Sequence, residues 1–231
     1  MCSSGRSRED AVSPVVGVML MLVVTIIIAA VVSAFTGGLA KGEDKAPTAV
    51  IDVKIKNTGE WRNSNIQFDV KSVSDPIPSA NAKIVTSWTS SSGTRGGNTT
   101  AKGLNTPNVQ YTSGNTRYQA PLGYGPGVLN WKTSSPFPVE QMFGNYTITA
   151  GTSMRASPYG YTTYNAGYGV VTPYVYNDDP TYWVTATDTD AMMALLGKNW
   201  NDLRAGDIVK VTIIHTPTGK MIYSKDVVVE G

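Results

Sequence analysis

Cysteine, histidine and charge are all scarce in this chain of 231 residues. The single cysteine is Cys2 and the single histidine is His215. One thiol forms no internal disulfide, and one thiol with one imidazole does not provide the ligand clusters of zinc sites. Charged residues make up only 16% and the formal net charge is +2. The chain therefore lacks the basic stripe that neutralises phosphates, and we expect no nucleic-acid partner.

Motifs of common catalytic sites are also missing from the sequence. It contains no H-E-x-x-H, G-x-S-x-G or G-K-[ST] pattern. The acidic pairs Asp178-Asp179 and Asp188/Asp190 lack the downstream glutamate of an EF-hand loop, and such side chains more often cap helices or decorate turns. We therefore expect no enzymatic activity, no cofactor and no metal site.

A further absence is local: the thirty residues from Ala11 to Ala40 carry no charge. Within this run, the segment from Pro14 to Phe35 contains thirteen Val, Ile, Leu and Phe residues. As a helix this segment is roughly 33 Å long, enough to cross a hydrocarbon core of about 30 Å. Its aliphatic and aromatic residues favour insertion by roughly 4 to 8 kcal/mol. The sequence therefore predicts a membrane-spanning helix that begins at Pro14, where the missing N–H costs nothing.

Composition alone leaves more than one role open for this apolar segment. A cleaved secretory signal is one, because Val32 to Ala34 has the small-residue pattern for cleavage before Phe35. The apolar stretch is longer than the usual signal core of about 7 to 15 residues, however, and Glu9 and Asp10 offset the preceding arginines. A plain single-span anchor for an external domain fits the length equally well.

A third role rests on the residues around the start of the segment, REDAVSPVVGV from Arg8 to Val18. This run resembles the N-terminal domain of archaeal type IV pilins, whose precursors have a short charged leader followed directly by A-V-S-P-V-hydrophobic-G. The resemblance implies that a prepilin peptidase cleaves between Asp10 and Ala11 and leaves the helix on the mature protein. Bacterial type IV pilins carry a glutamate at the fifth mature position. In this chain the fifth mature position is Val15. The pairing of that glutamate with the terminal amine of a neighbouring subunit is therefore not available here.

The segment also has a surface suited to contact between helices. Ala29 with Ser33 and Ala30 with Ala34 form two small-x-x-x-small pairs, although small residues are common in any transmembrane helix. The resemblance implies a helical homopolymer built from the membrane by pilus assembly machinery. The residues expected in its core helix are Pro14, Val15, Gly17, Met21, Thr25, Ala29, Ala30, Ser33, Ala34 and Phe35.

Composition divides the chain into four expected parts. These are a leader at 1–10, a hydrophobic helix at 11–36, a linker at 37–47 and a head domain at 48–231. The helix is expected to stop at Thr36-Gly37-Gly38, and a polar stretch ending at Pro47 leads into the head.

The head has the sequence pattern of a β domain. Apolar and polar residues alternate over 51–55 and 66–70, and again over 209–213 and 221–229, which predicts two antiparallel pairs. Shorter strands are expected at 82–88, 146–150, 169–176 and 182–186, with one helix at 190–199. The expected class is α+β, with a long hydrophobic helix followed by a mostly antiparallel β-sandwich.

Tyrosines are concentrated in the middle of the head, where eleven of twelve lie between Ser87 and Tyr182. They are either half-buried strand residues or an exposed surface for adhesion or subunit contact, since tyrosine combines an apolar face with a hydroxyl. Glycans are among the partners that such a surface suits. The candidates for exposed contact are Tyr159, Tyr161, Tyr164, Tyr168, Tyr174 and Tyr176.

Two N-x-[ST] sequons occur, at Asn98-Thr99-Thr100 and Asn145-Tyr146-Thr147. In a cell-surface protein both are candidate N-glycan acceptors. Asn98 lies in a Gly- and Thr-rich stretch with room for a sugar, whereas Asn145 adjoins an expected strand. The sequence therefore favours Asn98.

The sequence and the resemblance together predict a structural subunit of an archaeal type IV pilus-like surface filament with a role in adhesion. The precursor is expected in the cytoplasmic membrane with its head outside the cell. Its expected partners are copies of itself, the membrane before assembly, the prepilin peptidase and the assembly machinery, and possible glycans. The alternative is a single-span surface-binding protein that does not polymerise.

Overall fold

The computed structural model describes residues 14–39, 45–60, 63–102, 108–112, 116–134, 136–158, 191–197 and 199–231. The chain divides into two compact units, with the boundary between Lys45 and Ala46. The first contains one long helix and the second is the head.

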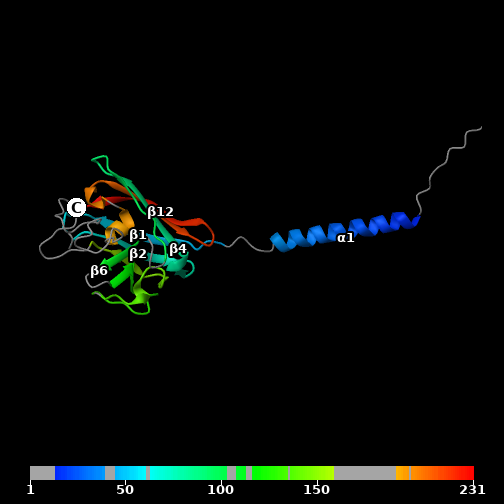
Figure 1. The fold of residues 1–231 in the computed structure, drawn as a ribbon, viewed down its shortest axis with the longest axis horizontal. Helices are drawn as coiled ribbons and strands as arrows, with labels where there is room; N and C mark the ends of the chain where they lie inside the picture. The colour runs from blue at the N-terminus through cyan, green and yellow to red at the C-terminus, as the bar shows by residue number, and fades with distance from the viewer. Residues whose placement is uncertain are drawn as a thin grey trace, which may run out of the picture. The chain divides into compact units, whose positions relative to one another are not determined.

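Helix α1 (Pro14–Leu39) is continuous over 26 residues (Figure 1). It begins at Pro14, as the sequence predicts. It continues through Gly37 and Gly38 to Leu39, three residues past the expected end, because glycine lowers helix propensity by about 1 kcal/mol without forbidding the helix. The hydroxyl of Thr25 donates to the carbonyl of Leu22 at 2.9 Å, so the polar group in the middle of the helix is satisfied internally.

The head is built on one curled, eight-stranded sheet with the strand order β5-β4-β11-β12-β1-β2-β10-β8 (Figure 1). Two short ladders, β3 with β9 and β6 with β7, lie beside it. This confirms the α+β class and the mostly antiparallel head. The strands of the head are β1 (Ala49–Lys56), β2 (Asn65–Val73), β3 (Ile77–Pro78), β4 (Ala82–Thr89), β5 (Arg95–Gly96), β6 (Val109–Thr112), β7 (Thr116–Gln119), β8 (Leu122–Tyr124), β9 (Thr147–Ile148), β10 (Ser153–Ala156), β11 (Ile208–His215) and β12 (Lys220–Glu230).

Both predicted antiparallel pairs are confirmed. In β1 and β2, Ile55 lies opposite Ile66 and Val53 opposite Phe68, while β11 and β12 form the terminal hairpin. Residues that alternate along each strand, such as Ile51, Val53 and Ile55 in β1, are buried, and those between them are mostly exposed or half-buried, so one face of the sheet forms the core. Of the shorter expected strands, 82–88 is confirmed as β4, whereas 146–150 contains only the two-residue β9.

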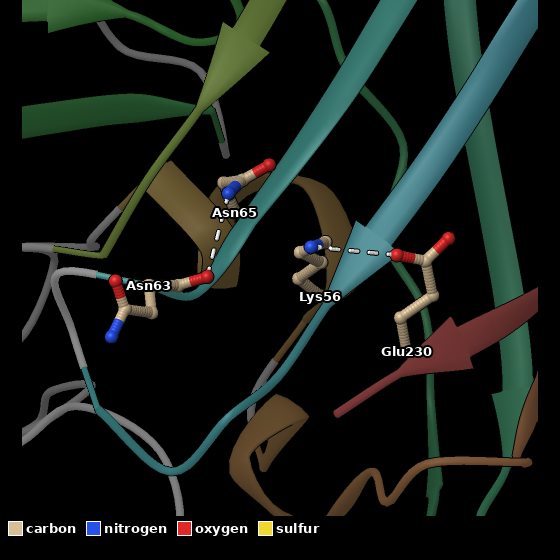
Figure 2. A network of polar contacts seen from close by, with 4 residues as sticks. All are labelled: Lys56, Asn63, Asn65 and Glu230. Carbon is tan, nitrogen blue, oxygen red and sulfur yellow. Dashed lines mark hydrogen bonds and ion pairs between the residues drawn. The ribbon is translucent and has the colours of Figure 1, made fainter.

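The sheet contains one parallel pair, between β1 and β12, which places the first strand of the head beside the last. The paired residues are Ile55 with Val229 and Lys56 with Glu230. The Lys56 ammonium lies 3.6 Å from the Glu230 carboxylate (Figure 2). Both side chains are about half exposed, so solvent screens this ion pair and it contributes at most about 1 kcal/mol.

The core of the head contains the short helix α2 (Ala191–Leu196), drawn in orange in Figure 1. All six of its residues are buried, and it contacts β4, β6 and β10. Its position confirms the helix expected at 190–199, although among the residues described in that range only these six are α-helical. Three short 3-10 turns, η1 (Ser79–Asn81), η2 (Val139–Gln141) and η3 (Trp200–Asp202), complete the described elements.

The buried phenol of Tyr146 is expected to make the head less stable at alkaline pH. Its ring is buried and its hydroxyl donates to the carbonyl of Pro121 at 3.0 Å. Burial, with a smaller contribution from Tyr124, raises the pKa of this phenol well above its ordinary value of 10.0. The unfolded chain therefore loses this proton near pH 10 while the folded chain keeps it, and stability falls as the pH rises above 10.

We expect the urea midpoint to decrease above pH 10 and to decrease less steeply in Tyr146→Phe, which has no proton to lose. Tryptophan fluorescence of the full chain in detergent, followed from pH 8 to 11.5, checks this. Equal slopes in the two proteins would contradict it.

Candidate assembly helix and head surface

Helix α1 is apolar on every side. All the side chains described in it, from Pro14 to Ala34, are exposed, and its large aliphatic residues range from 44% exposure at Val24 to 71% at Met21. The span from Pro14 to Ala34 has a mean hydropathy of 3.2 and is long enough to cross a membrane. A helix with no polar face has no stable position in water, so it requires lipid or other apolar helices around it.

The small residues expected to make contacts between helices lie within α1. Ala29 and Ser33, and likewise Ala30 and Ala34, are four residues apart in α1 and share a face one turn apart. A side chain added at Gly17 would meet nothing within 4 Å, which leaves a thin, open position near the start. These residues form a surface that allows close approach of a second helix. The side chain of Phe35 lies outside the described residues.

Several predicted sites fall on parts of the chain that the structure does not describe. The cleavage residues Asp10 and Ala11 precede the first described residue. The tyrosines from 159 to 176, the acidic pairs between 178 and 190, and the strands expected at 169–176 and 182–186 also lie outside the described residues.

The two sequon asparagines lie in different environments. Asn98 is half-buried, and its side-chain amide donates to the carbonyls of Ala194 at 2.9 Å and Met193 at 3.5 Å, near the end of α2. Asn145 is exposed in the turn between η2 and β9. The accessibility that the sequence suggested is thus reversed.

Residues 10–51 match the family model described as archaeal type IV pilin, N-terminal. The N-terminal segment of the chain is thus similar to the N-terminal domain of archaeal type IV pilins. The match contains the whole of α1 and extends to Ile51 in β1, so the resemblance seen in the sequence is confirmed. The pilin family is structural and not enzymatic. No curated protein matches the chain.

A cluster of hydrogen bonds at the end of α2 was not predicted from the sequence. The Trp88 indole donates to the carbonyl of Leu196 at 2.8 Å, and the Thr86 hydroxyl donates to that of Leu195. With Asn98, these side chains satisfy carbonyls that a helix end leaves without an intrahelical partner. Roughly a hundred residues separate the donors from the helix, so no local signal in the sequence reveals this contact.

A second feature not predicted from the sequence is an apolar loop of the head that runs from β8 into η2. Leu129 is 95% exposed, and Trp131 and Val139 are about half exposed. The loop is held in place by the buried side chain of Gln141, which accepts from the Lys132 N–H at 2.9 Å and donates to the Lys132 carbonyl at 3.0 Å. The loop that carries these exposed apolar side chains is therefore held by hydrogen bonds to the rest of the head.

The single histidine of the chain, His215, is the last residue of β11. Its Nδ1 lies 3.0 Å from the Thr218 hydroxyl in the β11–β12 hairpin. Within the described ranges, no three His, Cys, Asp or Glu side chains gather as metal ligands.

Proposed function

We propose that this chain is a structural subunit of an archaeal type IV pilus-like surface filament. Its precursor is held in the cytoplasmic membrane by α1, a prepilin peptidase removes residues 1–10, and the helices then associate in the filament core. The heads are extracellular and coat the filament. The family match to residues 10–51 supports a pilin, and the finer steps are our proposal.

The observation that carries this proposal is the apolarity of α1 on all sides. An anchor that stays in the membrane needs only this property, but a pilin helix is withdrawn from lipid and must then be enclosed. Identical helices provide such surroundings, and the small residues Ala29, Ala30, Ser33 and Ala34 permit close packing between them. An open helical assembly follows when the same heterologous contact is repeated from copy to copy.

The N-terminus of the assembled protein tests this proposal. Filaments sheared from the producing cell should contain this chain beginning with Ala-Val-Ser-Pro, since cleavage between Asp10 and Ala11 exposes Ala11. N-terminal sequencing of the filament band and of the membrane fraction measures it, and the membrane fraction should also contain precursor beginning at Met1. Filaments starting at Met1, or protein starting at Phe35, would contradict the processing. Protein confined to the membrane with no filament would instead favour the single-span binding protein.

Adhesion is the proposed role of the head. The tyrosines at 159, 161, 164, 168, 174 and 176 supply the residue type for such a surface. Alanine substitutions there should reduce surface attachment or filament yield, measured on the same cells. Wild-type values for both would reject this role for the tyrosines.

A further inference from the structure

The two sequons of the head have unequal chances of modification, and the difference can be derived from the structure. We propose that Asn145 carries an N-linked glycan and that Asn98 is an unmodified cap of helix α2. This proposal rests on the extracellular head of the proposed function, because glycans are transferred on the outer side of the membrane. It otherwise depends only on the environments of the two amides.

Both ends of the Asn98 side chain are engaged in the fold. Its Nδ2 donates to the carbonyls of Ala194 and Met193, and its Oδ1 accepts the N–H of Thr99 at 2.8 Å. The backbone N–H of Asn98 donates to the Thr86 hydroxyl at 3.0 Å. This hydroxyl in turn donates to Leu195, so Asn98 belongs to the same cluster that satisfies the end of α2.

A glycan on Asn98 is incompatible with this arrangement. The sugar would be attached to Nδ2, the atom that faces the α2 carbonyls. A sugar on Nδ2 replaces one of the two N–H groups of this cap, next to a helix whose six residues are all buried, so the hydrogen bonds to both carbonyls cannot be kept. The remaining sequon residues are fixed as well, since the buried Thr100 hydroxyl accepts the N–H of Ile84 at 2.9 Å.

Asn145 presents its amide on the surface. Its backbone N–H donates to the carbonyl of Met142 at 3.0 Å, which places the side chain in an exposed turn. The following residue, Tyr146, is buried and anchors this turn. Thr147 begins β9, which pairs with β3, and its N–H donates to the carbonyl of Gly127 at 3.0 Å. The sequon therefore lies on a fixed support, with the Asn145 side chain exposed.

The transfer needs a donor from outside the chain, a lipid-linked sugar phosphate. A bond forms between Nδ2 of Asn145 and the anomeric carbon of the sugar, while the bond from that carbon to the phosphate oxygen breaks. The phosphate leaves with the electron pair, and the amide loses one proton. The side chain stays a neutral amide with one N–H.

Peptide mass spectrometry of the protein from its native cell tests the assignment. Trypsin separates the sites, because Asn98 lies in the peptide 96–102 and Asn145 in the peptide 133–155. We expect a glycan mass at Asn145, located by electron-transfer fragmentation, and an unmodified peptide 96–102. A glycan on Asn98, or an unmodified Asn145 in cells that glycosylate other surface proteins, would overturn the proposal.

Matched variants at Thr147 separate sequon recognition from other effects. Thr147→Ala should abolish the glycan at Asn145, whereas Thr147→Ser, which keeps the hydroxyl of the sequon, should retain it. Equal glycan occupancy in these two variants would contradict N-linkage at this sequon. The N-terminal peptide from the same digest reports leader cleavage separately, so failure of glycosylation and failure of the pilin proposal are distinguishable.

The capping role of Asn98 has its own readout, in full chain made in a host without N-glycosylation and kept in detergent. Asn98→Asp places a carboxylate against two carbonyls and removes their donor. We expect its thermal midpoint to fall by about 5 to 10 °C, against less than about 2 °C for the exposed Asn145→Asp. Equal shifts in the two variants would overturn the assignment of Asn98 as a cap.

Discussion

A single charge in the middle of α1 is expected to abolish filaments. Val24 lies at the centre of the span from Pro14 to Ala34. Replacing it by Asp exchanges a residue that favours insertion for one that opposes it by about 3 kcal/mol at the helix centre, a net loss of about 3 to 4 kcal/mol. This is a large part of the roughly 4 to 8 kcal/mol that drives insertion. In an assembled filament the same carboxylate would be enclosed among apolar helices, where an unpaired charge is still more costly.

Two measurements on the same cells separate the stages at which Val24→Asp acts. Alkaline extraction of membranes reports whether the precursor is inserted, and the yield of sheared filaments reports assembly. We expect filaments to be undetectable even if part of the precursor still inserts. Val24→Leu is the matched control, since it changes shape but not polarity, and it should keep both quantities near wild type. Normal filament yield from Val24→Asp would show that α1 is not enclosed in the assembled state.

The parts of the fold that the sequence predicted are those where one strong local pattern decides the structure. Helix α1 was predictable because its charge-free run of thirty residues indicates a lipid environment. In lipid, a single segment can satisfy its backbone hydrogen bonds only as a helix. Strands β1, β2, β11 and β12 were predictable because their apolar residues alternate over several positions and one face is buried. Strands of two to four residues, such as β8 and β9, are too short for periodicity to identify.

The rest depended on contacts between distant segments. The parallel pairing of β1 with β12 joins the two ends of the head and has no signature in either strand. The environment of Asn98 is the clearest case, because its Gly- and Thr-rich neighbours suggested an open loop. The structure places these neighbours against α2, about 95 residues further along the chain, where Gly97 and Gly197 approach closely. Gly97, which suggested an open loop, instead permits close packing against Gly197.

Gly127 is another glycine at a close approach between distant segments, and replacing it is expected to have a large effect on stability. Its φ is +83°, and a Cβ there would collide with the carbonyl oxygen of Thr147 and approach the Thr149 hydroxyl to 3.1 Å. The obstacle is backbone, and the Thr147 N–H donates to the Gly127 carbonyl at 3.0 Å, so neither partner moves without losing this hydrogen bond. Gly93 is a matched control, since its φ is +90° and a Cβ there meets nothing within 4 Å.

Gly93→Ala should therefore cost only the conformational penalty of a left-handed alanine, about 1 to 2 kcal/mol. Gly127→Ala adds the strain of an overpacked site, for a total of about 2 to 5 kcal/mol. Urea unfolding of the full chain in detergent, followed by tryptophan fluorescence, measures both. The two variants should differ in midpoint with unchanged slopes, because the clash alters the folded state and not the surface exposed on unfolding. Equal midpoints would mean that the contact between the Gly127 turn and β9 is looser than the structure shows, and that the Asn145 sequon beside it lies on a less rigid support.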